Sequence, residues 1–468
     1  MRVRFGVIAL ALMTAVMALS ACGSSKKSGS DDLGGGATTT VAGANAEACK
    51  NATLTSPEVG VTPQKITVTV IADVDNGFRP GLFKGSWNGV KAWGDYINAN
   101  GGLACRQVVV KQVDSHLSPD GSKAAVASAC TDSIALTGTT ALFLSDVSGM
   151  EGCKDKAGKA TGIPDFAELQ TEAAQQCSPV SFAALPNGSE CPYSGTGPRQ
   201  FRVGYTQYDY YLNKFGKDAM HGVFAIPKDV PSTIASTMPI VRAENQMGIK
   251  SDDEIGMSGT AGQSAYTPLV QSIKQHKSTY ARNGLDYTGT LLERKEAQAQ
   301  GINDQVKVWD CSLQCYDKRL ISEGGGATEG QYVWLNFLPF EDKGHNPELD
   351  AFLQYDKSPD GFGLQAWIAA EVFARAVNDA IKANNNDPNA ITRANILTAT
   401  KNIHDFNAGG LTPKLDIGGR IGSTCLVGMQ IQGDKFVRID PVDPGTFDCD
   451  NNKPPLVFKI DPAKEYKG

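Results

Sequence analysis

Apolar positions repeat with a two-residue period in some segments of this chain and with a helical period in others. The stretch "KITVTVIAD" alternates β-branched residues and predicts a buried strand, whereas "SWNGVKAWGDYINANGG" spaces its apolar residues as a helix does and ends on a helix stop. These patterns predict strand, helix, strand, helix and strand in turn over residues 65–73, 86–102, 106–115, 118–132 and 140–146. Such alternation favours a parallel sheet covered by helices.

The N-terminal segment differs from the rest of the chain. Arg2 and Arg4 precede an apolar stretch, Phe5–Ala21, which is marginal for a permanent membrane span of about 20 residues. A basic region, an apolar region and small residues in this order predict a signal peptide over residues 1–21. The quartet Leu-Ser-Ala-Cys, which ends at Cys22, resembles the lipobox of bacterial lipoproteins. The resemblance implies cleavage before Cys22 and lipidation of this cysteine; the alternative is an ordinary signal peptide with an incidental cysteine.

A flexible tether is expected after the signal. Residues 22–57 are mainly Gly, Ser, Thr, Ala and Asp, which bury too little apolar surface to offset the entropy lost on ordering. The folded part is therefore expected on the extracytoplasmic face of a bacterial cell membrane, held there by lipid chains. The net charge of −6 contains no basic block, which argues against nucleic acid as a partner, and no later apolar stretch approaches membrane length.

Ten cysteines follow Cys22, and an even number in an exported chain predicts up to five disulfides. Cys105 precedes a predicted strand and Cys130 ends the helix after it. Because the strand rises and the helix returns, both reach the same edge of the sheet and are predicted to pair. Local disulfides are predicted for Cys311–Cys315 and Cys425–Cys449. The remaining pairing stays open for Cys49, Cys153, Cys177 and Cys191.

A metal site is not expected. The cysteines of "CSLQC" have ligand-like spacing, but no second pair and no histidine stands near them.

Several stretches taken together resemble a known family. They are "GVTPQKITVTVIADV" and "GVKAWGDYINANGGLACRQVVVKQVDS" near the start, "SAYTPLVQSIKQHKSTY" and "LLERKEAQAQGI" in the middle, and "GLQAWIAAEVFARAVNDAI" near the end. In this order they are similar to type I periplasmic solute-binding proteins, more narrowly to the leucine/isoleucine/valine-binding group that serves ABC importers. The resemblance covers about residues 61–440. It implies an α/β fold of two doubly wound parallel-sheet lobes joined by three crossings, with no cofactor, and a monomer that meets ABC permease subunits.

The resemblance also implies how the chain is divided. Lobe one is expected over residues 58–200 and 325–408, and lobe two over residues 201–322 and 409–455, with residues 456–468 as a C-terminal tail. In such folds, ligands bind outside the carboxyl ends of parallel strands, where helix N-termini offer N–H groups to a carboxylate.

Candidate ligand-binding residues lie in loops after predicted strands. In the family, a Ser or Thr after the third strand binds the ligand carboxylate, and Ser148, with Ser145 beside it, matches best. An acid of lobe two pairs with a ligand ammonium, and Asp286 and Asp229 are the candidates. The cleft wall is expected to include three aromatic residues, Tyr205, Phe78 and Trp309. The structural alternatives are a helix N-cap for the serine and core packing for the aromatic residues.

The chain departs from the family pattern in "GIPDFAELQTEAA". The family places small and hydroxyl residues there, whereas this chain has Phe166, Glu168 and Thr171. This difference bears directly on which ligand the cleft accepts.

The expected function is capture of a small polar metabolite, an amino acid or a related carboxylate, for delivery to an ABC importer. A ligand-sensing subunit of the same fold is the alternative. A tethered hydrolase has less support, because the serines of "SGTAGQS" lack the Gly-x-Ser-x-Gly context and no histidine accompanies a nucleophile. The chain is therefore not expected to be an enzyme.

Overall fold

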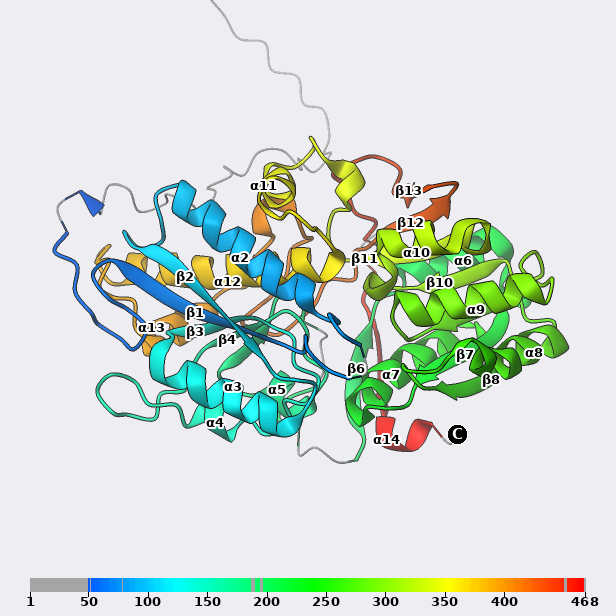
Figure 1. Ribbon diagram of the computed structural model, residues 1–468, viewed down its shortest axis with the longest axis horizontal. Coiled ribbons are helices and arrows are strands. Elements are labelled where there is room, and N and C mark those ends of the chain that lie inside the picture. Colours follow the sequence, from blue (N-terminus) through cyan, green and yellow to red (C-terminus); the bar gives the residue numbers. More distant parts are fainter. Residues whose placement is uncertain are drawn as a thin grey trace, which may run out of the picture. The chain divides into compact units, whose positions relative to one another are not determined.

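Two sheets organise the chain, and helices cover the faces of each (Figure 1). The computed structural model describes residues 49–50, 52–77, 79–186, 190–193, 197–449 and 453–466. They all fall within one unit, Thr39–Gly468. The α/β class and the two-lobe arrangement expected from the sequence are confirmed.

The first lobe is built on a parallel sheet. Its strands are β1 (Lys65–Ala72), β2 (Gln107–Asp114), β3 (Ala135–Thr139), β4 (Asp165–Ala167) and β5 (Ser181–Ala183). They lie in the order β2-β1-β3-β4-β5. Its helices are α2 (Lys84–Ala99), α3 (Pro119–Asp132), α4 (Ser148–Glu151), α5 (Ala173–Cys177), α11 (Pro347–Tyr355), α12 (Gly361–Ala383) and α13 (Arg393–Thr400). Helices α2 and α12 pack together on one face of the sheet, and α3 covers the opposite face (Figure 1).

The core of the first lobe lies between its sheet and the pair α2 and α12. A Cβ atom at Gly89 would lie 2.0 Å from the carbonyl oxygen of Gly363, so only glycine allows these helices to come this close. Trp93 is fully buried beside this contact, and its indole N–H donates to the carboxyl of Glu371 over 2.8 Å. The helical periodicity of the sequence therefore places the apolar face of α2 against α12.

The second lobe is built on a mixed sheet. Its strands are β7 (His221–Pro227), β8 (Lys250–Met257), β9 (Tyr280–Asn283), β10 (Val308–Cys311), β11 (Gln331–Leu335), β12 (Val427–Gln432) and β13 (Lys435–Asp440). They lie in the order β13-β12-β11-β10-β9-β7-β8, with β11–β12 and β12–β13 antiparallel and the other pairs parallel. Its helices are α6 (Thr206–Phe215), α7 (Pro231–Met247), α8 (Tyr266–His276), α9 (Tyr287–Ala299) and α10 (Lys318–Gly324).

Crossing segments join the lobes. Strand β6 (Arg199–Val203) leads into the second lobe and pairs antiparallel with β14 (Leu456–Ile460), and α14 (Pro462–Glu465) packs on α7. The expected tail at 456–468 therefore begins with a strand of the hinge. Strand β11 pairs in the second sheet, so the return to the first lobe comes after Leu335 and not at residue 325 as expected. Short 3-10 helices complete the fold at Lys217–Ala219, Gln263–Ala265, Leu313–Cys315, Gly325–Thr328, Phe340–Asp342 and Ala408–Gly410.

The third strand lies earlier than the sequence pattern predicts. It ends at Thr139, so the predicted strand at 140–146 is wrong. Gly138 has φ +70°, and a Cβ there would lie 2.5 Å from a methyl group of Val90, so a glycine turns the chain out of the sheet at this point. The amide of Leu142 then donates to the buried Asp73 over 2.8 Å. The apolar residues of "TALFL" thus belong to the loop after the strand.

All ten cysteines after residue 48 are paired. The disulfides are Cys49–Cys105, Cys130–Cys153, Cys177–Cys191, Cys311–Cys315 and Cys425–Cys449. The two local predictions are confirmed, and the prediction that Cys105 pairs with Cys130 is wrong.

Two buried arginines explain the correction. Arg106 donates to the carbonyl of Thr55 over 3.1 Å and so holds the start of β2 against the N-terminal segment. Arg393 donates to the carbonyl of Cys130 over 3.0 Å and lies 3.1 Å from the Sγ of Cys153. Cys105, at the start of β2, therefore lies beside the N-terminal segment that carries Cys49, whereas Cys130, at the end of α3, lies beside Cys153.

Candidate functional site

The carboxyl ends of strands from both sheets meet where the lobes contact each other. The loops after β1, β3 and β4 come from the first lobe, and those after β7 and β9 from the second. The hydroxyl of Ser232 donates to the carbonyl of Leu142 over 3.3 Å, and the guanidinium of Arg79 pairs with Asp286 at 3.1 Å. Ligands of open α/β sheets bind at such edges, so this cleft is the candidate site.

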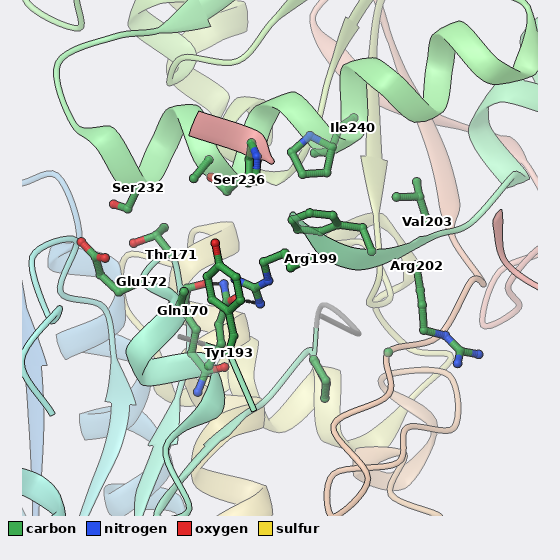
Figure 2. Close-up of a pocket in the computed structure, with 18 of the residues that line it drawn as sticks. Gln170, Thr171, Glu172, Tyr193, Arg199, Arg202, Val203, Ser232, Ser236 and Ile240 are labelled. Atoms are coloured by element: carbon green, nitrogen blue, oxygen red, sulfur yellow. Dashed lines mark hydrogen bonds between the residues drawn. The ribbon is translucent and has the colours of Figure 1, made fainter. Parts of the chain in front are cut away.

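A cavity of about 780 Å³ lies in this region, with walls from both lobes and from the hinge. The walls include residues 169–173 and 176 of the first lobe, residues of α7 between 231 and 240, and segments 201–204, 421–424 and 461–464. Figure 2 shows Ser232 of α7 beside Thr171 and Glu172, with Ile240 further along the same helix, near Val203. This volume is in the range of about 300–1,000 Å³ that small-molecule sites occupy.

Arg199 is the buried cation of this cavity. Its side chain, in a residue only 5% exposed, donates to the amide oxygen of Gln176 over 2.7 Å. The guanidinium lies 4.6 Å from the ring centre of Tyr193 and 5.3 Å from that of Phe201. Burial lowers the pKa of Arg199, and no carboxylate of the described residues lies within ion-pair distance of it.

Glu172 is the carboxyl of the same cavity. Burial raises its pKa, and the hydroxyl of Ser232 opposes the shift. Since these two residues come from different lobes, their contact joins the cavity walls. Thr171 beside them has a buried hydroxyl oxygen without a hydrogen-bond partner among the described residues.

A smaller cavity of about 220 Å³ lies beside the ion pair of Arg79 and Asp286. Asp286 is also the N-cap of α9, where it accepts from the amide of Gly289 over 3.1 Å. Asp360, the N-cap of α12, lines the same cavity, and burial raises its pKa to about 6. The carboxylate of Asp286 is therefore already neutralised by a cation of the opposite lobe.

Apolar side chains lie between the two cavities. Val74, Phe83 and Leu142 are buried in one cluster, and Val230 of the second lobe packs against it. Other members of the cluster line the cavities: Leu169 the larger one, and Leu82 and Phe362 the smaller one. The centre of the cleft is thus apolar.

The predicted carboxylate-binding serines lie away from both cavities. Ser145 and Ser148 are exposed, and the hydroxyl of Ser148 donates to Asp146 over 2.6 Å at the start of α4. Asp229 is exposed too, and accepts from the hydroxyl of Ser258 over 2.9 Å and from the amide of Gly259 over 2.6 Å. Of the predicted polar site residues, all of them described, only Asp286 lines one of these two cavities.

Two of the predicted aromatic residues, Trp309 and Tyr205, also lie outside the walls of both cavities. Trp309 is buried in β10, 4.5 Å from the guanidinium of Arg294, and Tyr205 is half-buried with Lys453 at 6.0 Å from its ring centre. Phe78 and Cys22 lie outside the described residues.

Sequence reasoning missed the residues that line the larger cavity. Arg199 and Ser232 stand in segments with no motif, and only the strand pattern of "RQFRV" marks a position facing inward. Thr171 and Glu168 are departures from the family pattern. Thr171 lines the cavity, while Glu168 is buried and burial raises its pKa well above the ordinary value.

Within the described part of the chain, no group of His, Cys, Asp and Glu side chains could hold a metal ion. No helix of that same part has the length and apolar character needed to span a bilayer.

Comparison with known proteins matches this architecture. The model of a family described as periplasmic binding protein matches residues 65–435. A leucine-binding protein from Thermotoga maritima is 15% identical with a TM-score of 0.61, and the match covers 80% of this chain and 97% of that one. A fatty acid ABC transporter substrate-binding protein from Thermomonospora curvata is 14% identical with a TM-score of 0.63, and the match covers 87% of this chain and 96% of that one. An ABC transporter solute-binding protein from R. palustris in complex with benzoate is 14% identical with a TM-score of 0.61, and the match covers 84% of this chain and 97% of that one. No curated protein sequence matches the chain.

Proposed function

The chain belongs to the periplasmic binding protein family, and we propose that it captures a small organic solute between its lobes and delivers it to an ABC importer. The observation that carries the proposal is the cavity of about 780 Å³ whose walls come from both lobes and from the hinge. Hinge closure in such a fold buries the ligand on all sides, and reopening releases it. Members of the family bind solutes and are not enzymes, which supports a role in capture without chemistry.

The ligand is a small carboxylate with an apolar body, of which an amino acid is one case. The apolar cluster and the apolar part of the cavity wall support such a body. Leucine, fatty acid and benzoate, which the similar structures name, also share this chemistry. Ser148 is exposed and its hydroxyl donates to Asp146 over 2.6 Å, so we favour the larger cavity over Ser148 as the place of the carboxylate. Asp286 instead serves, through Arg79, to hold the lobes together.

The protein is held at the membrane by lipid on Cys22, with the folded part outside the cytoplasm. The substitution Cys22→Ala should release the protein from the membrane or leave the precursor uncut, since two or more acyl chains are needed for stable anchoring. Fractionation followed by mass spectrometry of the N-terminus checks this. A Cys22→Ala protein that is processed and still membrane-bound contradicts the lipoprotein assignment.

Filling the larger cavity should abolish ligand binding. Ala235 lines it from α7, and Ala235→Trp places an indole in the space the ligand needs. Gln246→Trp adds the same group at an exposed position of the same helix and should leave binding unchanged. Native mass spectrometry of the purified proteins gives the answer, since the wild type and Gln246→Trp should retain a small molecule that Ala235→Trp lacks.

Thermal unfolding of both tryptophan variants controls for a loss of folding. Equal ligand retention by Ala235→Trp and the wild type would falsify the assignment of this cavity.

A further inference from the structure

Arg199 is a buried cation whose hydrogen-bonding capacity is only partly used. It starts the hinge strand β6 and lines the larger cavity, and its one side-chain hydrogen bond among the described residues goes to the neutral amide of Gln176. Its Nε is buried without a partner in that part of the chain. A buried charge is costly unless it is paired, so the site calls for an acceptor that the described residues do not provide.

The other charges near Arg199 do not offer that acceptor among the described residues. Glu190 attracts Arg199 from beyond ion-pair distance and accepts from the amide of Gln200 over 3.0 Å. Lys464 and Asp461 lie 3.0 Å apart and neutralise each other. Glu172 is turned towards Ser232, and burial raises its pKa. The guanidinium of Arg202 points away from Arg199 in Figure 2. The surroundings of Arg199 therefore favour an anion.

We infer that Arg199 binds the acidic group of an amphipathic anion, a carboxylate carried on an apolar body, inside the hinge cavity. This inference rests on the proposed function and names the ligand class of that same site. The guanidinium of Arg199 engages the carboxylate from the cavity wall, which Thr171 also lines. The body lies along Phe201, Pro239 and Ile240, which line the same cavity.

The chemistry of the anchor fits this class. A guanidinium holds a carboxylate through two parallel hydrogen bonds and so fixes its orientation. A straight-chain acid and an aromatic acid both meet the description, and the cavity volume of about 780 Å³ admits either. The carboxylate that pairs with Arg199 is common to the straight-chain and the aromatic acid, and the two acids differ in the length and shape of their apolar part.

The test is calorimetry with two matched pairs of probes, octanoate with octanamide and benzoate with benzamide. Each amide has the shape of its acid without the charge. The wild type should bind at least one of the two acids roughly 10- to 100-fold more tightly than its amide, the range expected for a buried charge-assisted hydrogen bond. The acid that binds identifies the straight-chain or the aromatic source.

Variants on β6 assign the effect to one residue. Arg199→Met should abolish the preference for the acid over its amide, and Arg199→Lys should restore part of it. Gln200→Met, at an exposed position of the same strand outside the cavity walls, should leave the preference as in the wild type. Should Arg199→Met fail to fold, the acid and amide comparison in the wild type and in Arg199→Lys still decides.

Two results would overturn the inference: binding of neither acid by the wild type, or equal affinity for acid and amide. Retention of a neutral small molecule that Ala235→Trp loses would keep the proposed capture of a solute between the lobes and reject a carboxylate as the ligand. The proposed function fails on a different result: Ala235→Trp and the wild type retain the same small molecule to the same extent in native mass spectrometry.

Discussion

Arg282→Met should lower the free energy of unfolding by about 3–5 kcal/mol, the loss seen when one partner of a buried ion pair is removed. Arg282, in β9, is almost fully buried and pairs with Asp310, and it lies 3.1 Å from the carboxyl of Glu244. Tyr211 and Tyr280 also donate to Asp310, over 2.5 and 3.0 Å. Without the guanidinium, two carboxyls would face each other in a site closed to water.

Chemical denaturation checks this value, with Lys91→Met as the control. Lys91 pairs with Asp95 at 2.6 Å on the exposed face of α2, and the loss of such a pair costs below about 1 kcal/mol. A similar small loss for both variants would contradict the role given to the buried cluster.

Glu293→Gln should remove a strong pH dependence of stability. Glu293 is buried in α9, where one oxygen accepts from the amide of Asn283 over 2.6 Å, and burial raises its pKa from 4.5 to about 7. The folded protein then binds more protons than the unfolded chain between these values, so the free energy of unfolding falls as pH rises from 4.5 to about 7. The full effect is about 3 kcal/mol, which the variant should not show.

The control for this prediction lies on the same helix. Hydrogen bonds from Gln300 and Thr267 lower the pKa of Glu296, so this carboxylate makes the free energy of unfolding rise with pH. Glu296→Gln should therefore change the pH dependence of stability in the opposite direction to Glu293→Gln, and far less. Denaturation midpoints between pH 4 and 8 provide the comparison. Parallel profiles for the wild type and Glu293→Gln would show that this carboxyl does not titrate as stated.

The elements with clear periodicity could be predicted from the sequence. The two strands predicted at 65–73 and 106–115 and the helices predicted at 86–102 and 118–132 all form, with ends displaced by a few residues at most. The third strand could not be placed, because the apolar run after Thr139 has strand-like composition yet packs in the cleft. Burial at a ligand site and burial in a sheet give the same apolar pattern.

The candidate site was harder to predict for a related reason. The third strand ends at Thr139, so Ser145 and Ser148 do not directly follow its carboxyl end, and both are exposed. Arg199 enters the cavity only because β6 pairs with a strand that lies more than 250 residues later. Asp286 was found because it follows a well-marked strand, but its partner Arg79 comes from the other lobe, and a pairing across lobes has no local signal.

The disulfides divide in the same way. Cys311 and Cys315 are 4 positions apart, so spacing alone predicts their disulfide. Separation does not single out Cys425–Cys449, at 24 positions, because Cys130–Cys153 has a separation of 23. Cys105 pairs instead with Cys49 from the segment before β1, which periodicity does not place.

The most direct test of capture between the lobes is a crystal structure with a bromine-labelled form of the acid that binds more tightly. Anomalous scattering locates the bromine without assumptions about the rest of the ligand. We expect it between the segment at 169–176 and α7, with the carboxylate on Arg199. Bromine outside the cavity walls, or on the exposed surface near Ser148, would contradict the account.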